Sequence, residues 1–238
     1  MSLISSIKKK LEELDEERSP TPEVISFQTI RRSVGWLGIL LPFSLAAGSL
    51  LHQPECWIQP SISHYYFTNM REVFVGVLCA VSLFLFTYKG HTRLDGIASN
   101  VAGLLCLGVA LFPTNIINGY ACQENVVSFI SIDFHSAIHF TCAGLFFLTL
   151  SLISLFLFTK SKFTKKNQTQ EKKSRNIVYK WCGGIMLVCI AVIGINSMLN
   201  QDETGHLVFW LETLALISFG VSWLTKGETL LGDKIAGR

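Results

Sequence analysis

The segment VGWLGILLPFSLAAGSLL, residues 34–51, decides the fold class because it contains no charged side chain. A bilayer core of roughly 30 Å needs about 20 mostly apolar helical residues, so this run is typical of a transmembrane helix. Lipid offers no partners to backbone N–H and C=O groups, and the run lacks the alternation of a barrel strand. The sequence therefore predicts a membrane-spanning helix here.

Further apolar runs follow at residues 73–88, 96–113, 132–159, 181–199 and 207–225. Half of the 238 residues are apolar and only 16% are charged, which is too apolar for an ordinary soluble domain. We therefore predict an all-α fold, a polytopic membrane bundle of about six transmembrane helices.

Basic residues predict the orientation of the bundle. Lys and Arg number six in residues 1–32, two in 89–93, eight in 160–180 and three after residue 225. The other three loops hold only Arg71. Because cytoplasmic loops carry an excess of Lys and Arg, this split predicts that both termini are cytoplasmic. Residues 1–32 lack the uninterrupted apolar region of a cleavable signal peptide, and we expect the inner membrane of a bacterium as the location.

The predicted spans divide the chain into five parts. They are an amphipathic cytoplasmic segment (1–32), a four-helix membrane part with two outer loops (33–159), a basic cytoplasmic linker (160–180), a two-helix membrane part (181–226) and a cytoplasmic tail (227–238). The basic linker is interpreted as charge that sets the topology. The expected partners are the lipid bilayer and a lipid substrate, and no nucleic acid is expected.

The third predicted span carries small residues on one face, namely Ser99, Gly103, Cys106 and Ala110. Such a stripe lets another helix backbone approach closely, so we expect this helix to be central.

Two cysteines, Cys56 and Cys122, fall in the outer loops, where oxidation is expected. Their spacing leaves both a disulfide and two free thiols open, since bridging requires Cα atoms within about 7 Å.

Polar and ionisable side chains gather near the predicted outer ends of the spans. Such groups are costly within a membrane, so each invites a functional hypothesis. Glu212 should lie about 7 Å below the outer boundary, a depth similar to that of His139. We predict that the following residues surround one cavity open to the outer side: Ser61, His64, Asp133, His135, His139 and Glu212.

His135 and His139 are i, i+4 neighbours, a spacing that allows both imidazoles to bind one metal ion. His64 could supply a third ligand, and Asp133 could ligate or orient a histidine. A zinc-bound water would then be the hydrolytic nucleophile, with Ser61 or Glu212 handling charge. The other interpretation is that the histidines hydrogen-bond between helices without a metal.

The Ser61–His64 pair, Asp133 and the H-x-x-x-H pair His135 and His139 resemble the superfamily of alkaline ceramidases and adiponectin receptors. That resemblance implies a membrane-embedded zinc hydrolase that cleaves an amide or ester bond of a lipid, with these residues as its metal-site elements. The segments SISHYYFTNMREVFVG (61–76) and LETLALISFGVSWLTKG (211–227) are similar to uncharacterised bacterial multi-pass membrane proteins, which implies no activity.

Three function classes therefore stay open. The first is the metal-dependent lipid hydrolase, with Ser61, Asp133 and Glu212 as catalytic residues and the three histidines as zinc ligands. The second is a small transporter or ligand-responsive protein in which Glu212 changes protonation and Arg71 or the histidines recognise an anion. The third is an accessory protein whose polar layer locks helices together. The sequence has no phosphate-binding loop, G-x-S-x-G or C-x-x-C motif to support nucleotide-driven transport, serine hydrolysis of that type or thiol redox chemistry.

Overall fold

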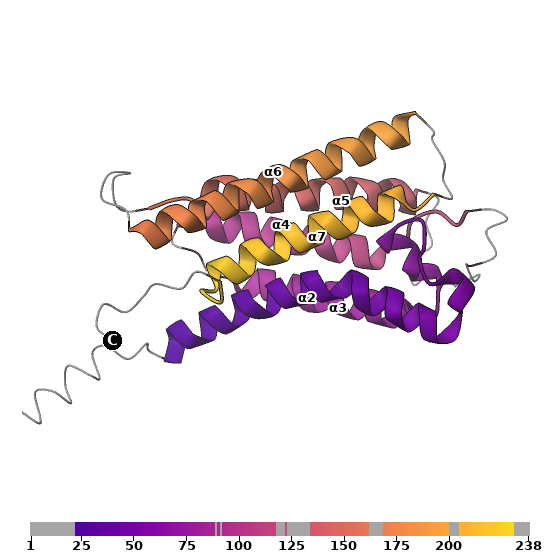
Figure 1. Cartoon of the computed structure of the whole chain (residues 1–238), viewed down its shortest axis with the longest axis horizontal. Coiled ribbons are helices and arrows are strands. Elements are labelled where there is room, and N and C mark those ends of the chain that lie inside the picture. Colours follow the sequence, from indigo (N-terminus) through magenta and orange to yellow (C-terminus); the bar gives the residue numbers. More distant parts are fainter. Residues whose placement is uncertain are drawn as a thin grey trace, which may run out of the picture.

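The computed structural model describes residues 22–88, 90, 92–117, 122, 134–161, 169–199 and 205–230, and all regular structure in them is helical. The long helices lie side by side (Figure 1): α2 (Pro22–His52), α3 (Arg71–Thr87), α4 (Arg93–Leu111), α5 (His135–Leu152), α6 (Gln170–Met198) and α7 (Leu207–Lys226). Two short 3-10 helices, η1 (Pro54–Cys56) and η2 (Ile62–Phe67), follow α2, and a π-helical turn, η3 (Ile153–Leu157), continues α5. The predicted all-α fold is confirmed.

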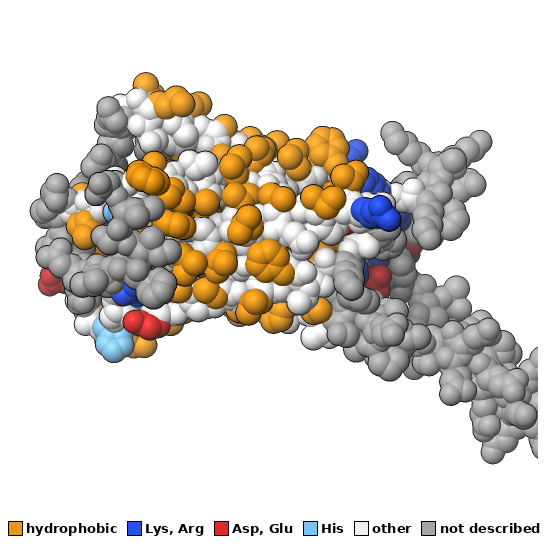
Figure 2. Space-filling model, turned by 180° about the vertical axis from the view of Figure 1, so that it is seen from behind, with side chains coloured by type: hydrophobic (Ala, Val, Ile, Leu, Met, Phe, Trp, Pro, Cys, Tyr) orange, Lys and Arg blue, Asp and Glu red, His pale blue; other side chains and the backbone are white. Residues whose placement is uncertain are grey.

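Five helices in the described part of the chain are long and apolar enough to cross a membrane, namely α2 from Gln28, α4, α5 together with η3, α6 and α7. The remaining long helix, α3, has 17 residues. Large apolar side chains such as Leu83, Leu104 and Phe156 are more than 60% exposed on the outside of the bundle. Figure 2 shows a broad apolar band on one face of the bundle, with most of the visible Lys and Arg at one end. This surface fits an integral membrane protein.

Most helices begin and end within a few residues of the predicted spans, but α2 begins at Pro22 instead of residue 34 and α6 begins at Gln170 instead of residue 181. The second half of the predicted linker, residues 170–180, is therefore helical. Thr169 caps the helix, because its side chain accepts a hydrogen bond from the Lys172 backbone N–H at 3.2 Å. The Gln, Glu and Lys residues that follow are good helix formers, and a search for apolar runs does not detect them.

The six long helices form a closed ring in which each packs against its neighbours in sequence and α7 packs against α2. The share of the apolar 18-residue stretch that is buried inside the bundle is largest in α7, at 56%, compared with 39% in α4. Three apolar side chains of α4, Leu94, Ile97 and Leu104, are more than half exposed. The prediction that the helix at 96–113 is central was therefore wrong, and α7 is the most buried helix of the ring.

The small-residue stripe of α4 does admit a neighbouring backbone, that of α3. The Ser99 hydroxyl donates to the Leu85 carbonyl and the Ser82 hydroxyl donates to the Gly103 carbonyl, each at 2.7 Å. Ser99 and Cys106 are fully buried. Close approach through small residues and interhelical hydrogen bonds therefore joins α3 to α4, as the stripe predicted.

Glycines also allow the backbones of α2 and α7 to approach each other closely. A Cβ added to Gly220 would lie 2.5 Å from the Gly35 carbonyl oxygen, and one added to Gly35 would lie 2.9 Å from the Gly220 carbonyl oxygen. Real Cβ atoms essentially never approach a backbone oxygen this closely. The ring therefore closes only because neither position has a side chain.

A disulfide joins the two loops that the sequence predicts on the outer side. Cys56 and Cys122 are bonded, with their Cα atoms 5.4 Å apart, which confirms the pairing that the sequence left open. The Gln59 side-chain amide lies beside them and donates to the Cys56 carbonyl at 3.0 Å. The loop after α2 is thus attached to the loop after α4.

We expect Gly220→Ala to destabilise the protein by about 1–3 kcal/mol, because the added methyl group overpacks the contact with Gly35. Gly184→Ala in α6 is the matched control, since a Cβ there meets nothing within 4 Å. Better helix propensity should make that control neutral or more stable by up to about 1 kcal/mol. Thermal unfolding of both variants in detergent would measure the difference, and equal midpoints would contradict this account of the α2–α7 contact.

Candidate functional site where α7 begins

The segment between α2 and α3 folds into a compact buried structure instead of an open loop. Most of η2 is buried, including Ser63, Tyr65 and Tyr66. The Tyr65 hydroxyl donates to the Trp57 carbonyl at 2.5 Å, and the Thr68 hydroxyl donates to the Tyr65 carbonyl at 2.9 Å. Figure 1 places this segment at the end of the bundle where α7 begins. The polar residues of η2 therefore have fixed positions.

Glu212 of α7 anchors η2 to the bundle. Its carboxylate accepts a hydrogen bond from the Ile62 backbone N–H at 2.6 Å, and the Ser63 backbone also bonds to it. One turn earlier, the Phe209 N–H donates to the Pro60 carbonyl at 3.0 Å. Backbone N–H donors stabilise a carboxylate that would be costly if left unpaired at this depth. Glu212 thus positions the backbone next to Ser61.

Ser61 and His64 form a hydrogen-bonded pair at the start of η2. The Ser61 Oγ lies 2.6 Å from His64 Nδ1. Ser61 is buried and His64 is partly buried. A serine hydroxyl in contact with an imidazole is an arrangement that can produce a nucleophile.

Burial, with a smaller contribution from the nearby His139, lowers the pKa of His64 to about 4. The Asn115 backbone hydrogen-bonds to the imidazole and raises its pKa, as expected when a carbonyl accepts from a ring N–H. His64 is therefore neutral at pH 7. With one ring N–H directed to Asn115, Nδ1 is left to accept the proton of the Ser61 hydroxyl.

His135 and His139 connect α5 to the end of α4. His139 Nδ1 lies 2.7 Å from the Phe112 carbonyl, and His135 Nδ1 lies 2.8 Å from the Pro113 carbonyl. Since carbonyls only accept, each Nδ1 carries its proton. His139 is 1% exposed, and both histidines satisfy carbonyls that follow a helix end. This arrangement corresponds to interhelical hydrogen bonding, the alternative that the sequence left open.

The structure brings the predicted site residues together in separate pairs. His64 interacts electrostatically with His139, while Glu212 contacts the η2 backbone. Among the described residues, no three His, Cys, Asp or Glu side chains gather where they could hold a metal ion. His64 Nδ1 contacts Ser61, while His135 and His139 use Nδ1 for backbone carbonyls, and zinc binding stays a prediction. Asp133 lies outside the described residues.

Several contacts of the site could not be predicted from the sequence. Asn115 acts through its backbone, which leaves no signal in the residue type. Arg71, considered as an anion ligand, donates to the Tyr66 hydroxyl at 2.8 Å and lies 4.5 Å from the centre of that ring. Arg71 therefore has a partner within the protein.

No protein family, curated protein or solved structure matches this chain. The geometry of its residues therefore carries the functional argument.

We expect acid to destabilise the protein through His64. Its pKa is about 4 when folded and about 6.5 when unfolded, so the unfolded chain takes up the proton first as pH falls. The contribution of the buried imidazole, up to about 3 kcal/mol, is fully present above pH 6.5 and is lost between pH 6.5 and 4.

Unfolding midpoints measured from pH 7.5 to 4 in detergent would test this, with His64→Gln expected to flatten the acid limb. His52→Gln, at an exposed position, is the control and should leave the limb unchanged. An acid limb that is identical in all three proteins would assign the pH dependence to other groups.

Proposed function

We propose that this chain is a membrane hydrolase that crosses the bacterial inner membrane six times, with both ends in the cytoplasm. In this proposal the Ser61–His64 pair cleaves an ester or amide bond of a lipid on the outer side. The observation that carries the activity is the 2.6 Å contact between Ser61 Oγ and His64 Nδ1.

The packing of α3 supports a sixth span. This helix lies between α2 and α4 in the ring and is about 25 Å long at 1.5 Å per residue. Six crossings return the chain to the side on which it started. The first part of α2 and the end of α7 should then lie on the same side. In agreement with this, the Arg32 side chain of α2 donates to the carbonyl of Gly227, which follows α7, at 2.9 Å.

The proposed reaction begins when the Ser61 oxygen attacks the acyl carbonyl of the lipid while His64 takes the hydroxyl proton. The bond from the carbonyl carbon to the leaving oxygen or nitrogen breaks, and His64 gives its proton to that atom. Water then attacks the acyl-serine with His64 again acting as the base, which releases the fatty acid and restores Ser61. A neutral imidazole is required at the start, in agreement with the lowered pKa of His64.

Glu212 supports this activity as a positioning residue. Its carboxylate holds the Ile62 N–H at 2.6 Å, directly after Ser61 in the chain. Replacement by Gln keeps an oxygen acceptor but removes the charge. In this proposal, Glu212 fixes the position of the backbone segment that carries Ser61 and His64.

Topology is tested by reporter fusions. Fusions after residue 165 and after Arg238 should both report the cytoplasm, because the basic residues concentrate on that side. A fusion between Cys56 and Ser61 should report the opposite side. A cytoplasmic signal from this last fusion, or an outer signal from either of the first two, would overturn the six-span topology.

Activity is tested with a fluorophosphonate probe, which reacts covalently with activated serines. Purified wild-type protein should be labelled at Ser61, and Ser61→Ala should lose the label. Ser63→Ala is the matched control on the same buried segment and should keep it. Labelling should fall as pH approaches 4, where His64 becomes protonated. His64→Gln should reduce labelling by about 100-fold or more, the typical contribution of a general base.

Mass spectrometry of the labelled protein would locate the adduct. An adduct on another serine, or equal labelling of Ser61→Ala and wild type, would refute the proposal. A Glu212→Gln protein that folds but labels more slowly would support the positioning role. Turnover of a lipid ester that persists in Ser61→Ala and is abolished by a zinc chelator would favour the metal-dependent mechanism instead.

A further inference from the structure

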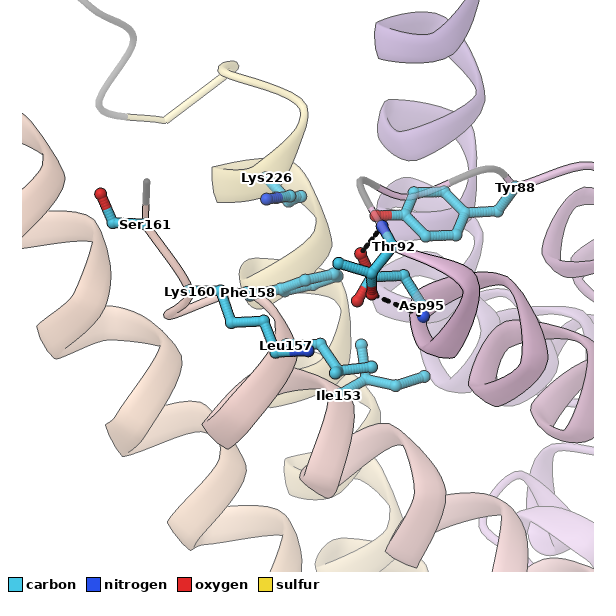
Figure 3. A pocket seen from close by; sticks show the side chains of 9 residues that line it. All are labelled: Tyr88, Thr92, Asp95, Ile153, Leu157, Phe158, Lys160, Ser161 and Lys226. Carbon is cyan, nitrogen blue, oxygen red and sulfur yellow. Dashed lines mark hydrogen bonds between the residues drawn. The ribbon is translucent and has the colours of Figure 1, made fainter. Parts of the chain in front are cut away.

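A second candidate site lies at the opposite end of the bundle from Ser61. It is a cavity of about 380 Å³ between the α3–α4 turn, the end of α5 and the end of α7. Figure 3 shows Tyr88, Thr92 and Asp95 on one side, facing Phe158 and Lys160 across the cavity, with Lys226 nearby. A volume of this size is within the range of small-ligand sites.

Asp95 brings a buried, incompletely bonded carboxylate to this cavity. One oxygen, Oδ2, accepts a hydrogen bond from the Thr92 backbone N–H at 2.9 Å as part of a capping box at the start of α4. The other, Oδ1, is buried and has no hydrogen-bond partner among the described residues, and the whole residue is only 7% exposed. A buried carboxylate oxygen without a donor is unfavourable, so a ligand that supplies an N–H or O–H would be stabilised here.

Positive charge surrounds the same cavity. Lys160 and Lys226 line it, and the charges of Arg31, Lys172 and Arg175 act on Lys226. Among the groups that act electrostatically on Lys226, Asp95 is the acidic one. At least three of the cations also contact protein groups. Lys172 Nζ donates to the Phe158 carbonyl at 2.9 Å, Arg31 lies 5.4 Å from the Tyr88 ring centre and Lys226 lies 5.3 Å from the Phe158 ring centre. The excess of cations favours an anionic group, and phosphate is the group that such clusters commonly bind.

The remaining wall is apolar and comes from a local irregularity of α5. Ile153 and Leu157 are the first and last residues of the π-helical turn η3, and both line the cavity. Such turns are rare and are often found at functional sites. The cavity thus combines cations, one unsatisfied acceptor and an apolar wall at the end of the apolar band, where lipid headgroups lie.

We propose that this cavity binds a phosphorylated headgroup that also carries a hydroxyl or ammonium donor. The phosphate lies against Lys160 and Lys226, and the donor bonds to Asp95 Oδ1. The headgroup belongs either to a phospholipid of the adjacent leaflet or to a soluble phosphorylated polyol or amine. This inference is independent of the proposed hydrolysis at Ser61.

Native mass spectrometry of the full chain from nanodiscs of mixed lipids tests the proposal. Phosphatidylethanolamine and phosphatidylglycerol have both groups, whereas phosphatidylcholine has the phosphate but no donor. We expect the protein to retain the first two lipids about tenfold more than phosphatidylcholine. One hydrogen bond to a charged group accounts for a difference of this size. Asp95→Asn should abolish this preference because an NH2 group would face the donor, although its oxygen can still cap α4.

Charge is tested separately. The double variant Lys160→Gln/Lys226→Gln should weaken retention of all three lipids, while Lys173→Gln, at an exposed position on α6, should change nothing. In phosphatidylcholine nanodiscs, stabilisation of wild type but not Asp95→Asn by glycerol 3-phosphate or phosphoethanolamine would identify a soluble ligand. Equal retention of the three lipids by wild type with no effect of either soluble compound, or an unchanged preference in a folded Asp95→Asn protein, would overturn the proposal.

Discussion

The contact that the rest of the structure depends on is the close approach of helix backbones through small residues. Lipid tails are as apolar as leucine side chains, so the hydrophobic effect does not hold the helices together within a membrane. Instead, serine hydroxyls reach carbonyls of neighbouring helices, as Ser82 does to Gly103 and Ser151 to Gly183, each at 2.7 Å. The Gly35–Gly220 contact closes the ring by the same means.

Both candidate sites lie at the ends of the bundle, where regular helix gives way to other structure. At the end where α7 begins, η2 presents Ser61 and His64 and is attached to α7 through Glu212. At the other end, a capping box and a π-helical turn shape the cavity around Asp95. Helix ends leave backbone groups without partners, and side chains brought in to satisfy them can also bind or react. The rigid ring supplies the fixed distances that such sites require.

The all-α fold and the places of most long helices could be predicted because they depend on local composition. The Cys56–Cys122 bond was one of two alternatives that the sequence left open. The early starts of α2 and α6 and the deep burial of α7 were missed. Both depend on features that an apolar run does not record, namely cap chemistry and the partner of each helix face. At the site, the Ser61–His64 pairing could be anticipated from a spacing of three residues. The hydrogen bonds from the two α5 histidines to the carbonyls of Phe112 and Pro113 could not be anticipated, because any residue type supplies a carbonyl.

The closure of the ring by α2 and α7 has a consequence for how the protein is made. These helices are the earliest and the latest of the ring to leave the ribosome, and domains generally form in that order. Until α7 emerges, the Gly35 face of α2 has only lipid or an assisting protein to contact. The assembly of the whole bundle is therefore timed by its last helix, and a chain that stops before residue 207 would leave a narrow glycine groove facing the membrane interior.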